Sequence, residues 1–359
     1  MNMSIIAASR LRTLPFNTTA FIIEVGTSKT GVSNNNQFQF TGAEGDYDVV
    51  AKKGGLVVQT FINLSDEETI TFSDGSGVYV LEVSAKEVNG FNRISFNNGG
   101  DNSKVQDIKQ LGTIVWSSFE GAFYGCTNTL VTATDVPNLS SVTSMKDMFN
   151  RCISANPDVS NWDVSSVTDM DYMFYNASIA NPDTSNWDVS NVTNMSNMFR
   201  STSSANPDTS NWDVSSVTNM DSIFQNASLA NPDVSNWDMS SVTNTRNMFR
   251  DASSANPDTS NWDVSSVTDM FAMFLDASSA NPDTSNWDVG SVTNMSYIFI
   301  RSNLSIQNLT ACYENWSQLT LKQNVSFSAR NTKYNASGQA GRDILVNTYN
   351  WTIEDGGLV

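Results

Sequence analysis

The sequence predicts a mainly β protein: a sandwich of short antiparallel strands, then a solenoid of 25-residue coils, then a small α/β C-terminal cap. Phe and Trp each recur at intervals of 25 residues through the middle of the chain. Short alternating strands precede this array, and the period is lost from about residue 301. With 359 residues, of which 39% are hydrophobic, the chain is long enough to bury a substantial core.

The part before the repeats divides into two segments. Residues 1–30 have little pattern of their own, and we interpret them as an N-terminal arm or attachment segment. Residues 31–117 contain short runs of alternating apolar and polar residues between Gly, Asn, Asp and Ser turns. These runs are QFQF at 37–40, YDVV at 47–50, LVVQTF at 56–61, TITF at 69–72, VYVLEV at 78–83 and RISF at 93–96. Such strands at this spacing predict an antiparallel β-sandwich.

Residues 118–300 form the repeat array, with the pattern W-D-V-x-x-V-T-x-M-x-x-[MI]-F. The periodic aromatic residues are Phe149, Phe174, Phe199, Phe224, Phe249, Phe274 and Phe299, with Trp162, Trp187, Trp212, Trp237, Trp262 and Trp287. A fixed period in the twenties is the signature of a solenoid, in which each coil buries its apolar residues by stacking on its neighbours. An Asn-Pro-Asp triplet supplies a turn in each coil. Residues 301–359 then form a cap that covers the last apolar layer, with helical segments followed by a final strand.

Strand alternation assigns the side chains of each coil to two faces. Around Trp187 it places Trp187 and Val189 inside and Thr184 and Asp188 outside. The outward face supplies our candidate binding residues: Asn161, Asp163, Asn186, Asp188, Asn211, Asp213, Asn236, Asp238, Asn261, Asp263, Asn286 and Asp288. If the Trp residues faced outward instead, they would form an aromatic stripe suited to stacking on sugars. The Met row belongs with Phe in the core, where flexible thioethers tolerate small stacking errors, rather than in a cofactor site.

The six Asp residues of this face form a ladder that admits two interpretations. Neighbouring coils lie about 4.8 Å apart, so adjacent carboxylates repel by roughly 0.8 kcal/mol at the dielectric constant of water. The stack is therefore tolerable as a solvated polar face. Alternatively it binds cations: Ca²⁺ takes oxygen ligands and suits Asp, Asn and Ser, although no EF-hand or glycine-rich calcium motif is present. Calcium on the Asp ladder is thus the one cofactor that the sequence raises.

Composition excludes several classes of function. The formal net charge of −18 disfavours binding to nucleic acid and to anionic membranes. The chain contains no His, which removes Ser-His-Asp catalysis and His-ligated metal sites. No apolar stretch is long enough to span a bilayer, and the N-terminus does not resemble a signal peptide, so we expect no membrane insertion and folding inside a cell. Cys126 and Cys152 should lie in adjacent coils, as buried thiols or as a disulfide.

Three segments carry a resemblance to a known family. The repeat NWDVSSVTNMSNMF, the entry segment WSSFEGAFYGC at 116–126 and the closing NWTIEDGG at 350–357 resemble BspA-type, leucine-rich-repeat-like bacterial surface proteins. The resemblance implies a leucine-rich-repeat-like solenoid preceded by an immunoglobulin-like or PKD-like domain. It also implies adhesion and surface recognition. Relatives often carry Trp-Gly-Asp-Gly in that domain, where this chain has AKKGG at 51–55.

A second, shorter resemblance concerns location. MSIIAASRLR at 3–12 is similar to the openings of bacteriophage structural proteins. Since virion proteins assemble in the host cytoplasm and need no export, this favours a phage particle over a bacterial cell surface. The N-terminal region would then contact other virion proteins.

The coils differ most at the two positions after the first Met and at the position after Phe. These variable exposed positions include Tyr172, Tyr175, Arg246, Arg250, Phe271, Leu275 and Tyr297. Mixed charged and aromatic residues could form a contact surface for a partner or a neighbouring subunit; the alternative is that these positions are unconstrained.

These observations favour a non-enzymatic virion protein of a tail or surface fibre. It would be a homo-oligomer that binds a host surface glycan or protein through many weak contacts. The alternatives are a bacterial cell-surface adhesin and a structural decoration protein of the particle. A polysaccharide-degrading tailspike would need two acids in unlike environments, whereas the repeat Asp residues have near-identical surroundings.

Overall fold

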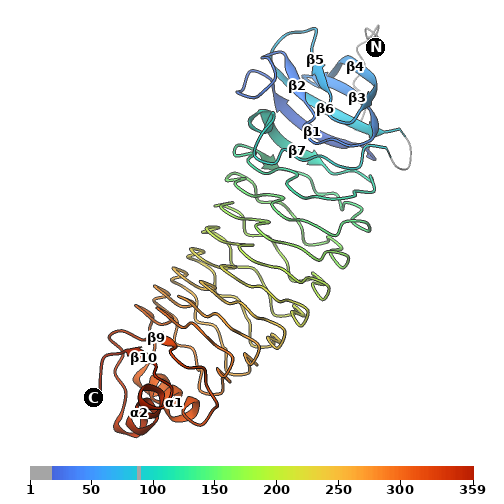
Figure 1. Ribbon diagram of the computed structural model, residues 1–359. Coiled ribbons are helices and arrows are strands. Elements are labelled where there is room, and N and C mark those ends of the chain that lie inside the picture. The colour runs from blue at the N-terminus through green and yellow to red at the C-terminus, as the bar shows by residue number, and fades with distance from the viewer. Residues whose placement is uncertain (1–17, 87–89) are drawn as a thin grey trace. The chain divides into compact units, whose positions relative to one another are not determined.

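Antiparallel β-strands build the N-terminal part of the protein (Figure 1). The computed structural model describes residues 18–86 and 90–359. One compact unit comprises Met1–Val167 and Met173–Pro182, and a second comprises Thr168–Tyr172 and Asp183–Val359. The predicted similarity of residues 3–12 to phage proteins lies outside the described residues.

A six-stranded sheet with the order β4-β3-β6-β1-β7-β8 dominates the first unit. Its strands are β1 (Phe21–Gly26), β3 (Asp46–Lys53), β4 (Leu56–Ser65), β6 (Val78–Ala85), β7 (Val105–Gln110) and β8 (Leu130–Val131). β2 (Gln37–Gln39) and β5 (Thr69–Thr71) pair in a separate antiparallel sheet. Five of the six strands predicted between residues 31 and 117 are therefore present.

Two expectations about this region were wrong. The arm predicted for residues 1–30 contains β1, which lies between β6 and β7 in the large sheet. Its FIIEVG sequence is buried at five of six positions, so it lacks the polar alternation that reveals a half-exposed strand. The strand predicted at 93–96 is absent, because its backbone bonds to two different segments: Ser95 N–H donates to the Thr41 carbonyl, and Phe96 N–H donates to that of Ala122.

Aromatic side chains link the sheet to the first repeats. Phe21 of β1 packs edge-on against Trp116 with ring centroids 5.4 Å apart, and it also lies 6.4 Å from Phe123. Phe123 stacks on Phe149 at 5.7 Å, and Phe149 stacks on Phe174 at 5.6 Å. Strand β8 of the first repeat also pairs in parallel with β7. The predicted boundary at residue 117 is thus crossed by a shared core within the first unit.

A buried ion pair holds the loop between β1 and β2. The Lys104 ammonium lies 3.4 Å from the Asp101 carboxylate, and both side chains are fully buried. Lys104 also donates to the carbonyls of Ser33, Asn34 and Gln37. Asp101 accepts from the backbone of Ser33 and from Gln39. The surrounding hydrogen bonds compensate the cost of removing both charges from water.

In each repeat, the Phe and Trp side chains pack against the same residues of the neighbouring repeats. In the second unit, consecutive rings from Phe199 to Phe299 stack 5.5–5.8 Å apart. The Trp rings from Trp212 to Trp287 stack 6.2–6.4 Å apart, almost parallel. Each of these indoles donates its Nε1–H to a backbone carbonyl 28 residues earlier. The Trp row is therefore core, and the interpretation as an outward sugar-stacking stripe is wrong.

Backbone contacts between repeats are sparse and parallel. Isolated bridges join Asp169, Asn194, Asn219, Asn244, Asp269 and Asn294 in sequence. The Asn of the Asn-Pro-Asp turn adds a ladder, in which its side-chain oxygen accepts the N–H of the equivalent Asn in the next repeat, as from Asn231 to Asn206 at 2.8 Å. The triplet is thus more than a turn, because it also fixes the spacing of neighbouring repeats.

The alternation predicted around Trp187 is only half correct. Trp187 and Val189 are buried and Asp188 is exposed, as expected, but Thr184 is fully buried. Asp183 accepts the N–H of Ser185, and the resulting turn breaks the extended strand. The Thr184 hydroxyl then donates to the Asp208 carbonyl of the next repeat at 3.0 Å.

Two positions in each repeat have a left-handed backbone without being glycine. They are the second residue after the first Met, as at Ala272 (φ 53°), and the second after Phe, as at Asn226 (φ 58°). β-Branched side chains are strained in this region, and across the described repeats neither position holds Val, Ile or Thr. The variable positions are therefore restricted by backbone conformation.

The C-terminal part closes the array with helices and a strand pair. It contains α1 (Ile306–Trp316), the short η2 (Ala336–Gly338), α2 (Gln339–Asn347), and the parallel pair β9 (Ser326–Ser328) and β10 (Thr352–Glu354). Trp316 of α1 donates its Nε1–H to the Thr284 carbonyl, as the repeat Trp residues do. Phe327 of β9 packs edge-on against Phe299 at 6.1 Å. Helical segments followed by a strand were predicted here and are confirmed. None of the helices in the described ranges is long and apolar enough to cross a membrane.

Replacing Lys104 by Met should destabilise the first unit by about 3–5 kcal/mol, because the Asp101 charge stays buried without its partner. Native-state hydrogen exchange of β1 and β7 amides measures this loss. Lys86→Met is the control: its partner Asp48 is partly exposed, so the cost should stay below about 1 kcal/mol. Equal effects of the two substitutions would contradict the assignment.

Asn226→Val should destabilise the second unit by about 1–2 kcal/mol, because the exposed Asn226 has φ 58° and Val is strained there. Asn226→Gly at the same position should cost nothing. Urea unfolding followed by tryptophan fluorescence compares them. A Val variant as stable as the Gly variant would show that backbone conformation is not the constraint.

Candidate functional site

The predicted binding residues lie where alternation placed them. All twelve Asn and Asp residues of the outward face are exposed. The Asp side chain, however, has a local partner: its Oδ1 accepts the N–H of the residue two positions later, as from Ser165 to Asp163 at 3.1 Å and from Gly290 to Asp288 at 2.9 Å. Each ladder Asp thus stabilises a turn within its own repeat.

The hydrogen bonds of the ladder also set its charge. The Ser165 hydroxyl donates to Asp163 at 2.6 Å, and this bond, followed by that from the Ser165 backbone, lowers the pKa of Asp163. The pKa of Asp213 is lowered in the same way by Ser215, while the neighbouring Asp238 raises it by a smaller effect. Hydrogen bonding therefore outweighs repulsion along the ladder, and these carboxylates are ionised at neutral pH.

The ladder does not assemble a metal-binding cluster. In the described parts of the chain, no three Cys, Asp or Glu residues come close enough together to hold a metal ion. One oxygen of each ladder Asp is already used in its turn. Calcium binding at the ladder stays a prediction, and it would rely on single carboxylate oxygens from successive repeats.

The variable positions are partly brought together. In the second unit, Arg250, Phe271, Leu275 and Tyr297 line one cavity of about 340 Å³, with Ile300, Arg301 and Arg330. Arg246 adjoins it, with its guanidinium carbon 4.6 Å from the centre of the Phe271 ring. Tyr172 is half-buried in the second unit, and Tyr175 belongs to the first unit. We call this cavity the arginine–aromatic pocket.

Two members of the arginine–aromatic pocket escaped the sequence reasoning. Arg301 occupies the second position after Phe, and Arg330 follows β9 in the cap. A usable signal was the rarity of basic residues: between residues 183 and 300 the sequence has Arg200, Arg246 and Arg250 alone. All three stand directly after Met-type or Phe positions, the same side of the repeat as Arg301.

Two non-repeating acids meet in the first unit. Lys109 lies 2.9 Å from Asp107 and 3.2 Å from Glu24, beside a cavity of about 450 Å³. Burial lowers the pKa of Lys109, but its hydrogen bonds to the two carboxylates outweigh this and raise it. Thr132 also donates to both oxygens of Asp107. A shared cation favours two charged carboxylates, whereas glycoside hydrolysis needs one neutral acid.

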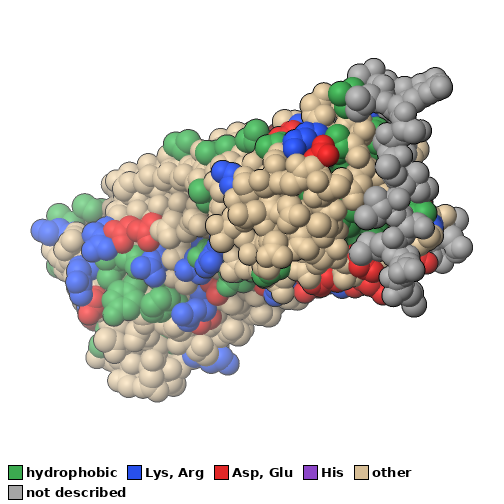
Figure 2. Space-filling view, turned by 90° about the horizontal axis from the view of Figure 1, so that it is seen from above, with side chains coloured by type: hydrophobic (Ala, Val, Ile, Leu, Met, Phe, Trp, Pro, Cys, Tyr) green, Lys and Arg blue, Asp and Glu red, His purple; other side chains and the backbone are tan. Residues whose placement is uncertain are grey.

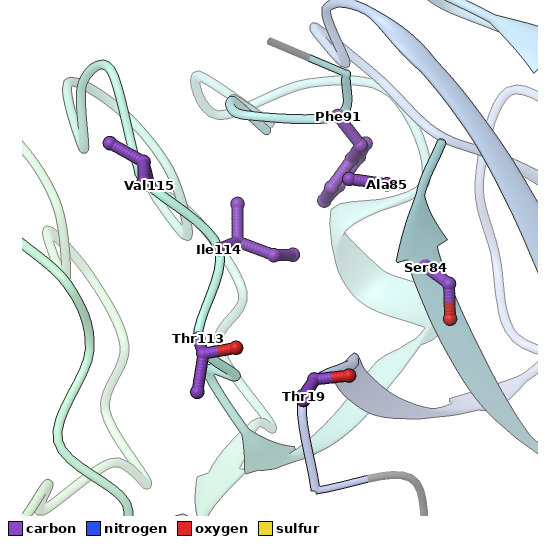
Figure 3. Close-up of a pocket in the computed structure, with 7 residues that line it drawn as sticks. All are labelled: Thr19, Ser84, Ala85, Phe91, Thr113, Ile114 and Val115. Carbon is purple, nitrogen blue, oxygen red and sulfur yellow. The ribbon is translucent and has the colours of Figure 1, made fainter. Parts of the chain in front are cut away.

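A further cavity of about 300 Å³ in the first unit has no charged lining. Phe91 and Ile114 point into it, and hydroxyl groups of Thr19, Ser84 and Thr113 lie around it (Figure 3). Such a lining offers no acid or base.

The cysteines are free thiols. Cys126, Cys152 and Cys312 are fully buried, and the Cys152 thiol donates to the Phe123 carbonyl at 3.0 Å. Burial raises the pKa of Cys126 and Cys152, and it raises that of Cys312 to about 12. Protonated thiols buried in this way are poor nucleophiles. The interpretation as buried thiols is confirmed.

Ser165→Ala should raise the pKa of Asp163 toward its ordinary value, because it removes the larger of the two hydrogen bonds that depress it. A pKa lower in the folded state gives stability that is present above the unfolded-state pKa, about 3.9. This contribution is lost as the pH falls through the folded-state value. NMR titration of the Asp163 carboxyl measures the shift. Ser166→Ala in the same repeat is the control and should leave the titration unchanged.

The repeats match a described family. The model of the family described as "Mycoplasma protein of unknown function, DUF285" matches residues 117–235 and again residues 226–337. The two matches together span most of the repeats and the beginning of the cap, and they are compatible with the BspA-type resemblance of the motifs. No curated protein and no solved structure matches the chain. Since the matched residues make up more than half of its length, the chain belongs to the DUF285 family.

Proposed function

We propose that the protein is a non-enzymatic binding protein that displays its repeats for recognition of a host surface. The observation that carries this proposal is the contrast between two sets of side chains. The repeated acids each stabilise a turn in their own repeat, whereas non-repeating arginine and aromatic residues gather in one exposed pocket. A uniform scaffold that carries one distinct, accessible site suits binding.

We further propose that the stacked repeats form a leucine-rich-repeat-like solenoid and that the N-terminal sheets belong to an immunoglobulin-like or PKD-like domain. Parallel bridges and ring stacking at 25-residue intervals support the solenoid. The antiparallel pairing of β1, β3, β4 and β6 supports the domain, while the AKKGG segment departs from the Trp-Gly-Asp-Gly of its relatives.

As for location, we propose a bacteriophage virion, in a tail or surface fibre, with the N-terminal region contacting other virion proteins and with homo-oligomers providing avidity. This rests on the sequence similarity at residues 3–12. A bacterial cell-surface adhesin is the second candidate, favoured by the BspA-type motifs. A decoration protein would need no ligand, and the exposed arginine–aromatic pocket counts against it.

A polysaccharide-degrading enzyme is disfavoured on chemical grounds. The acids of the repeats have equivalent surroundings, and Glu24 and Asp107 share the cation of Lys109. Neither arrangement separates a neutral acid from a charged base.

The labelled full-length protein should bind host cells without shortening their purified surface polysaccharide. Cell-associated fluorescence measures binding, and size-exclusion chromatography of the polysaccharide measures cleavage. Shortened chains would favour the tailspike. Absence of binding by a protein that mass spectrometry finds in purified particles would favour the decoration protein and contradict this proposal.

A further inference from the structure

Charges in the second unit are separated by position in the repeat. Acidic residues occupy the turns before and after each Trp, as at Asp208 and Asp213. Basic residues between 183 and 301 stand only in the Met-x-x-Met-Phe part of the repeat and directly after it: Arg200, Arg246, Arg250 and Arg301. A protein of net charge −18 thus concentrates its few cations on one side of the repeat. Figure 2 shows a face on which basic side chains surround hydrophobic ones.

The arginine–aromatic pocket combines guanidinium groups with an apolar floor. Arg250, Arg301 and Arg330 line it, together with Phe271, Leu275, Tyr297 and Ile300. Its volume of about 340 Å³ falls within the range of small-ligand sites. No acidic side chain is among its lining residues. The cavity therefore presents positive charge even though the protein as a whole is acidic.

Carboxylates outside the lining hold the arginines in place. Arg301 forms a two-pronged pair with Asp276, and Arg330 pairs with Glu354 at 3.1 Å. Arg250 donates its Nε–H to Asp251 at 3.2 Å. A guanidinium has five donors, so each arginine keeps N–H groups for a ligand. The partners lower the entropy lost when a ligand orders these side chains.

The aromatic rings of the pocket are arranged as a platform. Phe271 and Tyr297 meet edge to face with centroids 5.5 Å apart, and Arg246 covers one face of Phe271. Tyr297 is 46% exposed and has φ 62°, a backbone conformation that is unfavourable for a bulky residue. Large exposed aromatics at unfavourable positions are typical of functional sites.

We propose that the arginine–aromatic pocket binds a carboxylate-bearing sugar, such as a uronic or sialic acid residue of a surface polysaccharide. The guanidinium forks match the geometry of a carboxylate, and the rings offer apolar surface to the C–H groups of a pyranose. The net charge disfavours long polyanions such as nucleic acid. This inference rests on the proposed function and names the ligand class of its site.

Calorimetry with sialylated and glucuronate-containing oligosaccharides tests the inference, with carboxyl-reduced forms of both as neutral probes. We expect one acidic probe to bind at least 10-fold more tightly than its neutral form, and added salt to weaken binding. Arg250→Gln combined with Arg301→Gln should reduce that affinity at least 10-fold, as should Tyr297→Ala. Arg200→Gln is the matched control, because Arg200 occupies the position of Arg250 two repeats earlier. Unchanged melting temperatures would show that the variants are folded.

Several outcomes would overturn the inference: no binding of either acidic probe, equal binding of the neutral forms, or equal loss in the Arg200 control. Competition by an acidic peptide as effective as the sugar would assign the pocket to a protein ligand instead. The cell assay separates this inference from the proposed function. Cell binding that survives the double Arg substitution would refute the pocket alone, whereas a wild-type protein that binds no cells refutes the function.

Discussion

Stacking of identical side chains across repeats is the constraint on which the rest of the second unit depends. A single repeat cannot bury its Phe, Trp and Met residues, because it contains almost no regular strand and no helix. Burial comes from the equivalent residues one repeat away, at ring spacings of 5.5–6.4 Å. Any change in the repeat length would shift every one of these rings out of contact, which is why the period of 25 residues is constant from Phe149 to Phe299.

This constraint explains which features the sequence could predict. The core rows, the turns and the need for a cap follow from the period, and they are visible because each is repeated. Non-periodic features were harder to recognise. Strand β1 is buried on both faces and therefore has no alternation, and the burial of Thr184 depends on a hydrogen bond to the next repeat. Arg301 and Arg330 join one pocket through folding of the cap, although 29 residues separate them.

The acidic rows illustrate how one pattern can carry two meanings. A ladder of carboxylates looks like a metal site in the sequence, because the spacing and ligand types are suitable. In the structure, each Asp accepts a backbone N–H and in several repeats a Ser hydroxyl, and these bonds stabilise the charged form locally. The hydroxyl two residues later was the signal for this role, since Asp-x-Ser is a turn motif. Repulsion between neighbouring carboxylates is tolerated because it is weaker than these bonds and lies in solvent.

A repeated scaffold places strong limits on where specificity can arise. Equivalent residues in equivalent environments have nearly the same chemistry, so a distinct site requires departures from the repeat. In the second unit such departures cluster beside the cap, where Arg250, Phe271 and Tyr297 replace the small polar residues found at several equivalent positions. The left-handed backbone at Tyr297 shows that this replacement was accepted against local preference. The constant part of the repeat thus fixes the geometry, and its variable positions determine what that geometry can bind.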